Sequence, residues 1–320
     1  MEYILNAPSS TEDYIQSVHY PYVSCEILCA GIPCILSQLV STPILSRLLT
    51  FTSNTEYVDL RSAGYFEKIL TVLYTNQPGP LIAYLNANPN VLQEWIACMH
   101  SYSMAQLIAR LLSPEGACDT MDNDMSINSF NSLMMGGFDG LNMGLTHPVE
   151  EEPSEPLPIL GWTTDNVAMA TMVQQLTSSK ESEVHEHVGV VLVELIATIL
   201  RSSPSDGHSQ LHFLQQEPIL ESLMEAALPL ANATPSAMAA AIAIVGALVS
   251  GHGNADYQDA SREVPLVLTK CIARLPQICT LLRDADHSNG EITTQYQTQT
   301  PRLGLQRLKV KKQIATLFLQ

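Results

Sequence analysis

The sequence of 320 residues has little charge and few basic residues. Only 15% of its residues are charged, and 15 Lys and Arg stand against 32 Asp and Glu, which gives a formal net charge of −17. A surface this acidic repels phosphate backbones, so we expect no nucleic-acid binding. The longest apolar run, Ala237 to Val249, has 13 residues, fewer than the roughly 20 that a spanning helix needs. We therefore expect a buried helix there and no membrane insertion.

Signals for secretion and for a disulfide framework are also missing. The first residues contain no basic region followed by an apolar one, so they do not resemble a secretory signal. The seven cysteines are an odd number, and six of them lie in apolar helical patterns, which fits free thiols in a reducing compartment. We expect an intracellular protein in the cytoplasm, with the nucleus as a second compartment.

No complete reaction centre is recognisable in the sequence. It contains no Gly-rich loop followed by Lys-Ser or Lys-Thr that could cradle a phosphate group. The segment Asp206-Gly207-His208 is similar to a fragment of metallophosphatase signatures but lacks the further blocks of a two-metal centre. We predict no enzyme activity and no cofactor.

The sequence contains two groups of potential metal ligands, and neither has the spacing of a metal site. One is the cluster from Glu183 to His187, in which His-x-His points the two rings in opposite directions on a helix. We expect these residues, His185 among them, to form a solvated first turn. The second group, in an apolar helical pattern, is expected to be small buried side chains: Cys25, Cys29 and Cys34.

Apolar residues with helical spacing dominate what is present. The clearest stripe follows the i, i+3, i+4, i+7 pattern without a miss: Val188, Val191, Leu192, Leu195, Ile196, Ile199 and Leu200. Breakers separate such stripes, and in most of them Ser, Thr or Asn precedes Pro, which is typical of a capped helix start. Examples are Thr42-Pro43, Asn88-Pro89 and Thr234-Pro235. The sequence predicts an all-α protein of short helices joined by short turns.

The arrangement of these helices has two interpretations. Helices of roughly 10 to 18 residues, each with an apolar face too wide to bury alone, are typical of armadillo- and HEAT-like solenoids. A compact helical bundle is the alternative, because no strict internal period is visible. We favour an irregular armadillo/HEAT-like helical solenoid.

Residues 115–160 interrupt the helical pattern. This segment has nine acidic residues and no Lys or Arg, and it lacks the apolar surface that would offset its ordering entropy, so we predict a disordered insert. The insert separates a first helical half, residues 1–114, from a second half, residues 161–320. The polar stretch 284–300 of the second half is expected to be a mobile loop.

Several short blocks resemble a known family. The runs Tyr20-Pro21-Tyr22-Val23-Ser24-Cys25-Glu26-Ile27-Leu28 and Ala63-Gly64-Tyr65-Phe66-Glu67-Lys68-Ile69-Leu70 are similar to the opening blocks of the SAPS-domain family, the regulatory subunits of protein phosphatase 6-type serine/threonine phosphatases. The resemblance spans residues 20–112 and, more loosely, 163–320. Later matches follow in the family's order: Ser103 to Leu112, Asn166, Leu195-Ile196 and Leu303 to Val310.

The chain also departs from the family pattern. Only nineteen residues precede the Tyr-Pro block, where the family usually carries a longer helical segment, so we expect a truncated or divergent form. His100-Ser101-Tyr102 replaces a Gly-Thr-Ser-like turn, and Gln106 replaces an Asp. Any contact that needs that turn or that carboxylate is altered here.

The resemblance implies a non-catalytic regulatory or scaffold subunit. It would bind a protein phosphatase 6-type catalytic subunit and direct its substrate choice or location, with further scaffold or substrate proteins as additional partners. A generic armadillo-like adaptor in trafficking or nuclear transport is the alternative. The candidate partner-binding residues are polar or amphipathic members of the family-like blocks: Glu26, Tyr65, Lys68, Arg110, Arg307 and Lys309.

Two of these candidates, Arg307 and Lys309, belong to a basic cluster near the end of the chain, with no acidic residue after Glu291. One interpretation is a solvated face that offsets the dipole at a helix C-terminus. The other is a docking face for an acidic partner or for the chain's own acidic insert.

Overall fold

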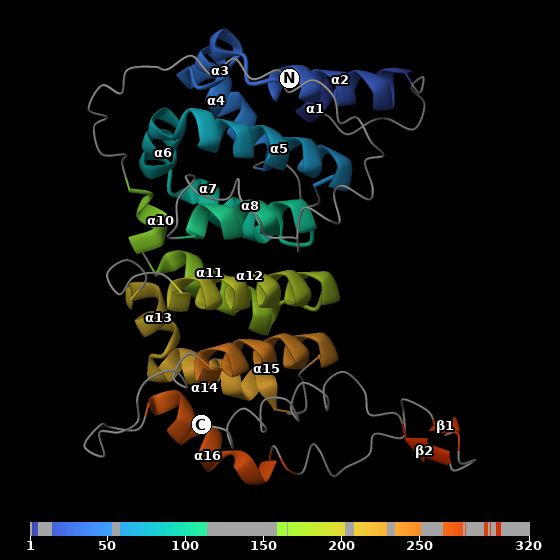
Figure 1. Ribbon diagram of the computed structural model, residues 1–320, viewed down its shortest axis with the longest axis vertical. Helices are drawn as coiled ribbons and strands as arrows, with labels where there is room; N and C mark the ends of the chain where they lie inside the picture. The colour runs from blue at the N-terminus through green and yellow to red at the C-terminus, as the bar shows by residue number, and fades with distance from the viewer. Residues whose placement is uncertain are drawn as a thin grey trace.

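The computed structural model describes residues 2–5, 15–52, 58–113, 159–164, 166–201, 208–228, 234–250, 265–277, 279, 291–293, 295 and 299–301. In these ranges the protein is all-α apart from one short pair of strands. The helices stack in successive layers along the long axis, with the first helices at one end and the last at the other (Figure 1). The all-α prediction is confirmed.

The first half of the chain contains α1 (Glu2–Leu5), a π-helical turn η1 (Ile15–His19), α2 (Tyr20–Leu28), α3 (Pro33–Leu39), α4 (Thr42–Leu49), a 3-10 turn η2 (Thr50–Thr52), α5 (Leu60–Asn76), α6 (Pro78–Ala87), α7 (Asn90–Ala97) and α8 (Tyr102–Leu112). The second half contains α10 (Gly161–Thr164), α11 (Val167–Ser178), α12 (Ser182–Arg201), α13 (His208–Leu214), α14 (Glu217–Ala227), α15 (Pro235–Ser250), α16 (Leu266–Ala273), β1 (Glu291–Thr293) and β2 (Gln299–Pro301).

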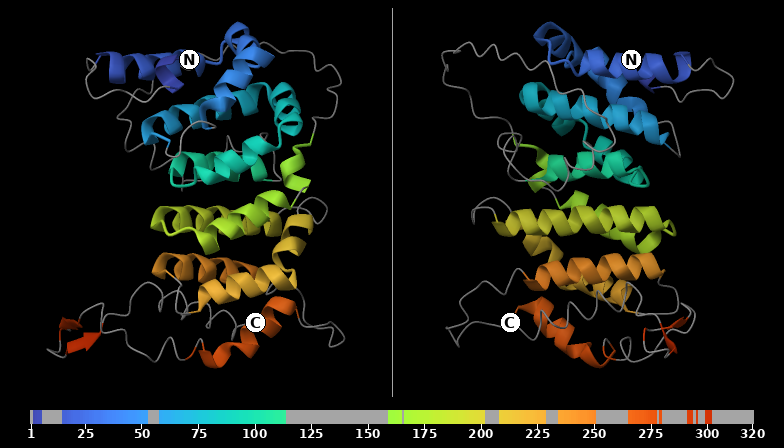
Figure 2. Two further views of the ribbon diagram at one scale, coloured as in Figure 1. Left: turned by 180° about the vertical axis from the view of Figure 1, so that it is seen from behind. Right: turned by 45° about the vertical axis from the view of Figure 1, so that its right-hand side comes forward.

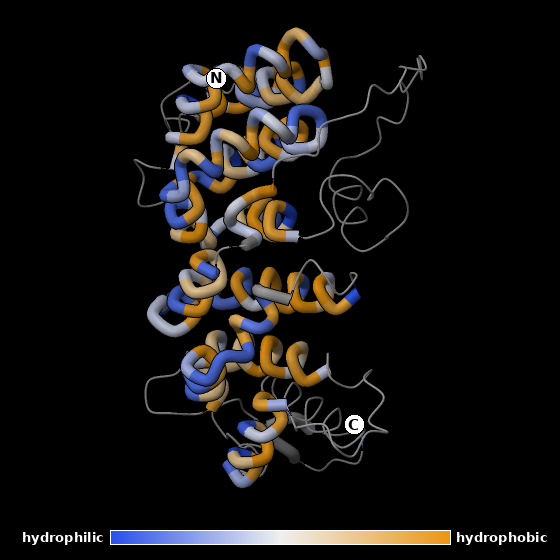
Figure 3. Tube along the Cα trace, turned by 90° about the vertical axis from the view of Figure 1, so that its left-hand side faces the viewer, coloured by the Kyte–Doolittle hydropathy of each residue, from blue (hydrophilic) through white to orange (hydrophobic). Residues whose placement is uncertain are grey.

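Two rows of helices run through the layers. Helices α2, α5, α8, α12 and α15 lie side by side, each in contact with the next, and we call them the first row. Helices α7, α11 and α14 contact one another in the same way and form the second row. Figure 2 shows the layers from behind and after a turn of 45° about the vertical axis. Hydrophobic positions recur along each helix (Figure 3), so every layer has apolar surface to bury against its neighbours.

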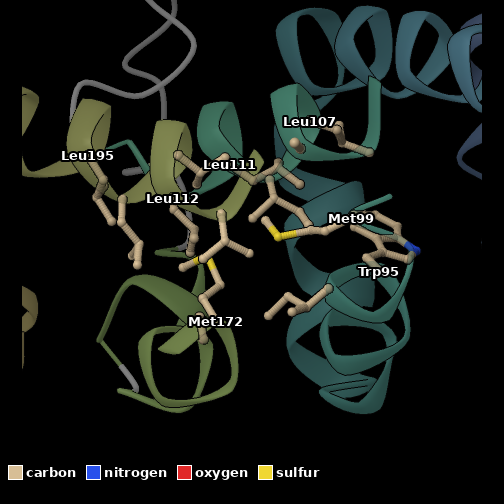
Figure 4. Close-up of a cluster of buried hydrophobic side chains, with 14 of the residues drawn as sticks. Trp95, Met99, Leu107, Leu111, Leu112, Met172 and Leu195 are labelled. Carbon is tan, nitrogen blue, oxygen red and sulfur yellow. The ribbon is translucent and has the colours of Figure 1, made fainter. Parts of the chain in front are cut away.

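One hydrophobic core runs across the boundary between the two halves. Trp95 and Met99 from the first half lie close to Met172 from the second (Figure 4), and all three side chains are fully buried. Helix α8 packs on α12, and α7 packs on α11. The two halves are therefore continuous layers of one stack.

Asn86 fixes the point at which the second half begins. Its side-chain amide donates a hydrogen bond to the carbonyl of Ile159 (2.9 Å), and its Oδ1 accepts one from the backbone N–H of Gly161 (2.7 Å). Beside this clamp, the rings of Trp95 and Trp162 meet edge to face, with centroids 5.6 Å apart. Leu160 was predicted to belong to the insert, but it is buried. Residues 115–158 of the predicted insert lie outside the described residues.

Proline marks the helix starts as predicted, whereas most of the predicted side-chain caps are absent from the described helices. Pro lies in the first turn of α2, α3, α4, α6 and α14 without a capping bond. Thr234 does cap α15, because its Oγ1 accepts a hydrogen bond from the N–H of Ala237 (3.4 Å). Asn88, in contrast, ends α6. The start of α5 is capped by Asp59, which accepts from the N–H of Ser62 (2.9 Å).

The predicted stripe on α12 is buried, with one exception. The six stripe residues from Val188 to Ile199 are at most 6% exposed, whereas the seventh, Leu200, is 40% exposed. Leu200 lies on the last turn of α12, at the edge of the stripe, where its side chain no longer faces the neighbouring layers. The expectation for Leu200 was wrong for this reason.

His185 was predicted to be solvated, and this was wrong: its side chain is fully buried. It lies three residues before Val188, in phase with the apolar stripe, so it enters the core with that stripe. Its Nε2 lies 3.0 Å from the carbonyl oxygen of Ser179, and its Nδ1 lies 2.8 Å from Oγ of Ser236. Because a carbonyl can only accept, Nε2 carries the proton, and both ring nitrogens are satisfied.

Residues 284–300 were predicted to be a loop without secondary structure. The described part of this stretch instead contributes to a two-stranded antiparallel ladder, in which Glu291 pairs with Pro301 and Thr293 with Gln299. The β-branched residues Ile292 and Thr300, which favour strands, form the central pair.

The crossing of α12 and α15 leaves no space for a side chain at Gly189. A Cβ atom there would lie 2.8 Å from the Cβ of Ala240. We expect Gly189→Ala to lower the free energy of unfolding by about 1–3 kcal/mol, as overpacking does, despite the better helix propensity of Ala. Gly64→Ala in α5 is the matched control, because its Cβ would meet Oγ of Ser103 at 3.7 Å. Urea unfolding should show that Gly64→Ala is neutral or stabilising; equal losses would contradict the close crossing.

The buried position of His185 has a measurable consequence. His185→Ala should lower the free energy of unfolding by about 1–3 kcal/mol, because the carbonyl of Ser179 loses its buried partner. His212 on α13 is exposed, so His212→Ala should change it by less than about 0.5 kcal/mol. Thermal unfolding of both variants checks the assignment, and an equally small effect at the two positions would place His185 at the surface.

Candidate functional site

The outward face of the first row is the candidate functional surface. Because α8 lies between α5 and α12, the exposed positions of these three helices form one continuous surface. These positions recur every three or four residues, which keeps them on one side of each helix. Its exposed or half-buried members are Arg61, Gly64, Lys68 and Thr75 on α5, Tyr102, Gln106 and Arg110 on α8, and Glu183, Glu186, Val190, Glu194 and Ala197 on α12.

The two opening family-like blocks meet at one end of this surface. The first block is α2 and the second is the middle of α5, and Nζ of Lys68 lies 2.5 Å from Oε1 of Glu26. The two side chains are 41% and 42% exposed. Burial disfavours the charged amine, but the hydrogen bond and the charge of Glu26 outweigh it, so the pKa of Lys68 is raised. The pair joins the two helices at the surface.

Tyr65 lies on the side of α5 that faces α2. Its backbone carbonyl is 3.9 Å from Sγ of the buried Cys25. The phenol is half-buried, and burial raises its pKa although the nearby Arg61 opposes this change. Tyr65 thus contributes a partly covered aromatic surface at the junction of α2 and α5.

Arg110 extends the charged surface onto α8. It is exposed, and its guanidinium favours the ionised form of Glu67 on α5. Burial nevertheless raises the pKa of Glu67, whose Oε1 accepts a hydrogen bond from Oγ1 of Thr71 (3.0 Å). Four predicted site residues, Glu26, Tyr65, Lys68 and Arg110, therefore lie on three neighbouring helices. Arg307 and Lys309 lie outside the described residues.

The acidic part of the surface, on α12, was not among the predicted partner-binding residues. Glu186 and Glu194 are exposed on either side of Val190, which is 48% exposed. Their spacing is the complement of the buried stripe, and this signal was available in the sequence. Toward α8, the ring of His187 lies 5.6 Å from that of Tyr102, and its Nδ1 is 2.7 Å from the carbonyl oxygen of Met99.

The surface thus combines the Glu26–Lys68 ion pair, the exposed Arg110 and aromatic rings at the α2–α5–α8 end with carboxylates on α12. Charged and aromatic groups arranged in this way can contribute to protein–protein recognition by charge and shape. In the described ranges, no group of three or more His, Cys, Asp or Glu side chains is placed to hold a metal ion. Among the described helices, none alone is long and apolar enough to cross a bilayer, although Ser17–Leu28 and Pro33–Leu39, bent by 104°, reach that length and composition together.

The chain is similar to two regulatory proteins of Xenopus laevis. These are serine/threonine-protein phosphatase 6 regulatory subunits 3-B and 3-A, each 22% identical to this chain over 333 and 334 residues respectively. The alignments cover 99% of this chain, which spans 35% of the length of each relative. No protein-family model matches the chain. No solved structure matches it.

The Glu26–Lys68 pair should contribute little to stability because both side chains are half exposed. Reversing either charge alone should lower the free energy of unfolding by about 1 kcal/mol or less, the range of exposed pairs. The exchange variant, Glu26→Lys with Lys68→Glu, should recover most of this loss. Urea unfolding in low and high salt gives the coupling energy; a loss of several kcal/mol for one reversal would instead indicate a buried, structural pair.

Proposed function

We propose that this chain is a non-catalytic regulatory or scaffold subunit that binds a protein phosphatase 6-type catalytic subunit and directs its substrate choice or location. The observation that carries the proposal is the similarity to two phosphatase 6 regulatory subunits over 99% of this chain. The ordered SAPS-like blocks point in the same direction. Catalysis then belongs to the partner.

The fold that we propose with this function is an irregular armadillo/HEAT-like solenoid of the SAPS type. Its support is the layered arrangement, in which the inner first-row helices α5, α8 and α12 each contact the first-row helix of the layer on either side. Stacked layers of this kind expose long surfaces for extended partners. The first-row surface around Glu26, Lys68 and Arg110 is the docking face that we propose, and the cytoplasm and nucleus are the proposed compartments.

The arrangement of charge on this face supports a protein partner. Lys68 is partly neutralised by Glu26, whereas the guanidinium of Arg110 is exposed next to the partly buried Glu67. An exposed charge at such a position affects the rate and specificity of association more than it affects stability. A substitution of Arg110 is therefore expected to change binding while leaving the stability of the fold nearly unchanged.

The proposal predicts a direct complex. Isothermal titration calorimetry of this chain against a purified phosphatase 6-type catalytic subunit should give saturable binding, and Arg110→Glu should weaken it by about tenfold or more, which corresponds to about 1.4 kcal/mol. Lys180→Glu is the control, because Lys180 is exposed in the turn between α11 and α12 and the charge change is the same. Thermal unfolding should be unchanged in both variants.

Three outcomes decide between the alternatives. Absence of binding by the folded full-length protein would overturn the phosphatase proposal. Affinity purification followed by mass spectrometry would then test the alternative, because an adaptor should recover trafficking or nuclear-transport factors. Phosphate release by the isolated chain would contradict a non-catalytic role.

A further inference from the structure

Two thiols lie together at the C-terminal end of α2. Cys25 is fully buried and Cys29 is half-buried, and their sulfur atoms are 3.9 Å apart. The Glu26–Lys68 ion pair lies beside them and joins α2 to α5. The pair thus has one sulfur accessible to small molecules and a second sulfur behind it.

The electrostatic environment makes the two thiols unequal. The hydrogen bond from the Cys25 thiol lowers the pKa of Cys29; burial opposes this change, and the Lys68 ammonium adds to it. The same hydrogen bond, together with burial and the negative charge on Cys29, raises the pKa of Cys25. Because the thiolate is the nucleophilic form, Cys29 is the more reactive sulfur.

We propose that Cys25 and Cys29 form a thiol modification site for low-molecular-weight disulfides, with Cys29 as the attacking sulfur and Cys25 as the resolving sulfur. The Cys29 thiolate attacks one sulfur of the small disulfide, a mixed disulfide forms on Cys29, and one small thiolate leaves. Cys25 then attacks the Cys29 sulfur, which breaks the mixed disulfide and releases the second small thiolate. The proton of Cys25 passes to a released thiolate. Overall, two protein thiols are oxidised and one small disulfide is reduced to two thiols.

The first step prepares the second. Once Cys29 is in the mixed disulfide, it no longer carries the negative charge that helps to raise the pKa of Cys25. The Lys68 ammonium, which favours the thiolate of Cys25, remains in place. Cys25 also needs no access to the reagent, because its target is the neighbouring sulfur.

The end of α2 can adapt to the new bond. Closing the disulfide brings the sulfur atoms from 3.9 Å to about 2.05 Å. Cys29 is the C-cap of α2, with φ −89° and ψ 1°, and Gly31 follows with φ +71°. The new bond would join two residues that already share the last helical hydrogen bond, from the N–H of Cys29 to the carbonyl of Cys25 (2.9 Å), next to the turn that ends the helix.

Other described cysteines provide controls in the same chain. Cys34 was predicted to be a small buried side chain, and this was wrong: it is exposed, because Leu36 and Leu39 form the buried face of α3. It therefore offers an accessible thiol outside the pair. Burial raises the pKa of Cys98 and of Cys271 to about 11, so both should be unreactive. Accessibility alone therefore predicts that Cys34 and the also exposed Cys279 react first, whereas the proposed site predicts Cys29.

The test is a time course of the reduced full-length protein with glutathione disulfide, followed by acid quenching, alkylation and peptide mass spectrometry. Cys29 should react several-fold faster than Cys34, and the product should be the Cys25–Cys29 disulfide. In Cys25→Ser, the glutathione adduct on Cys29 should accumulate instead. In Cys29→Ser, Cys25 should stay reduced. Cys34→Ser should behave like the unmodified sequence.

A second variant tests the electrostatic part. Lys68→Gln should slow the reaction of Cys29 several-fold, while Lys68→Arg retains the rate; circular dichroism establishes that each variant is folded. Reaction of Cys29 no faster than that of Cys34 would overturn the proposal. So would a failure of the Cys25→Ser variant to accumulate the mixed disulfide.

Discussion

The structure depends on the contact between successive helices of the first row. Each of these helices has an apolar face that its own layer cannot cover, so burial requires the layers on both sides. Helix α12 is the clearest example, because it packs on α8 on one side and on α15 on the other. At Gly189 the second contact is so close that the backbones of α12 and α15 nearly touch. The side chains available on the surface are those at the helical positions that this packing does not bury.

The phase of the helical pattern explains both what could be predicted and what was missed. The stripe from Val188 to Ile199 was sufficient to predict α12 and its buried side. The same phase includes His185, but residue type suggested a solvated position, and the partners that satisfy its ring come from Ser179 and Ser236. Ser236 is 51 residues away, and local sequence has no information about such a distant partner.

Most of the predicted side-chain caps are absent from the described helices, and the two strands were not predicted, because short local patterns decide neither feature. A Pro after Asn88 indicates only that the chain changes direction, and Asn88 ends the preceding helix rather than beginning the next. The ladder between β1 and β2 involves three pairs of residues. A run that short, among polar residues, does not differ in pattern from a loop.

The candidate site was partly accessible to sequence reasoning. The family-like blocks contained Glu26 and Lys68, but nothing in either block indicates that these residues, 42 positions apart, form an ion pair. Layer-to-layer packing brings them together. For the carboxylates on α12, the sequence did show the spacing that places them on the exposed side of the helix. It did not show that this side lies next to α8. The pairing of Cys25 with Cys29 follows directly from one helical turn, whereas the difference in burial between the two thiols depends on the packing of α2 and could not be read from the sequence.

The clamp made by Asn86 has a consequence for how the stack tolerates change. Asn86 holds Ile159 and Gly161 against α6, and the two tryptophan rings close the same joint. The layers on either side of the joint are held by side-chain contacts rather than by the chain that connects them. Because the cost of closing a connection between two fixed ends rises by only about 0.6 kcal/mol per doubling of its length, a longer or shorter connection between the halves should leave the order of the helices unaltered. The joint is therefore a position at which the stack should accept an inserted segment.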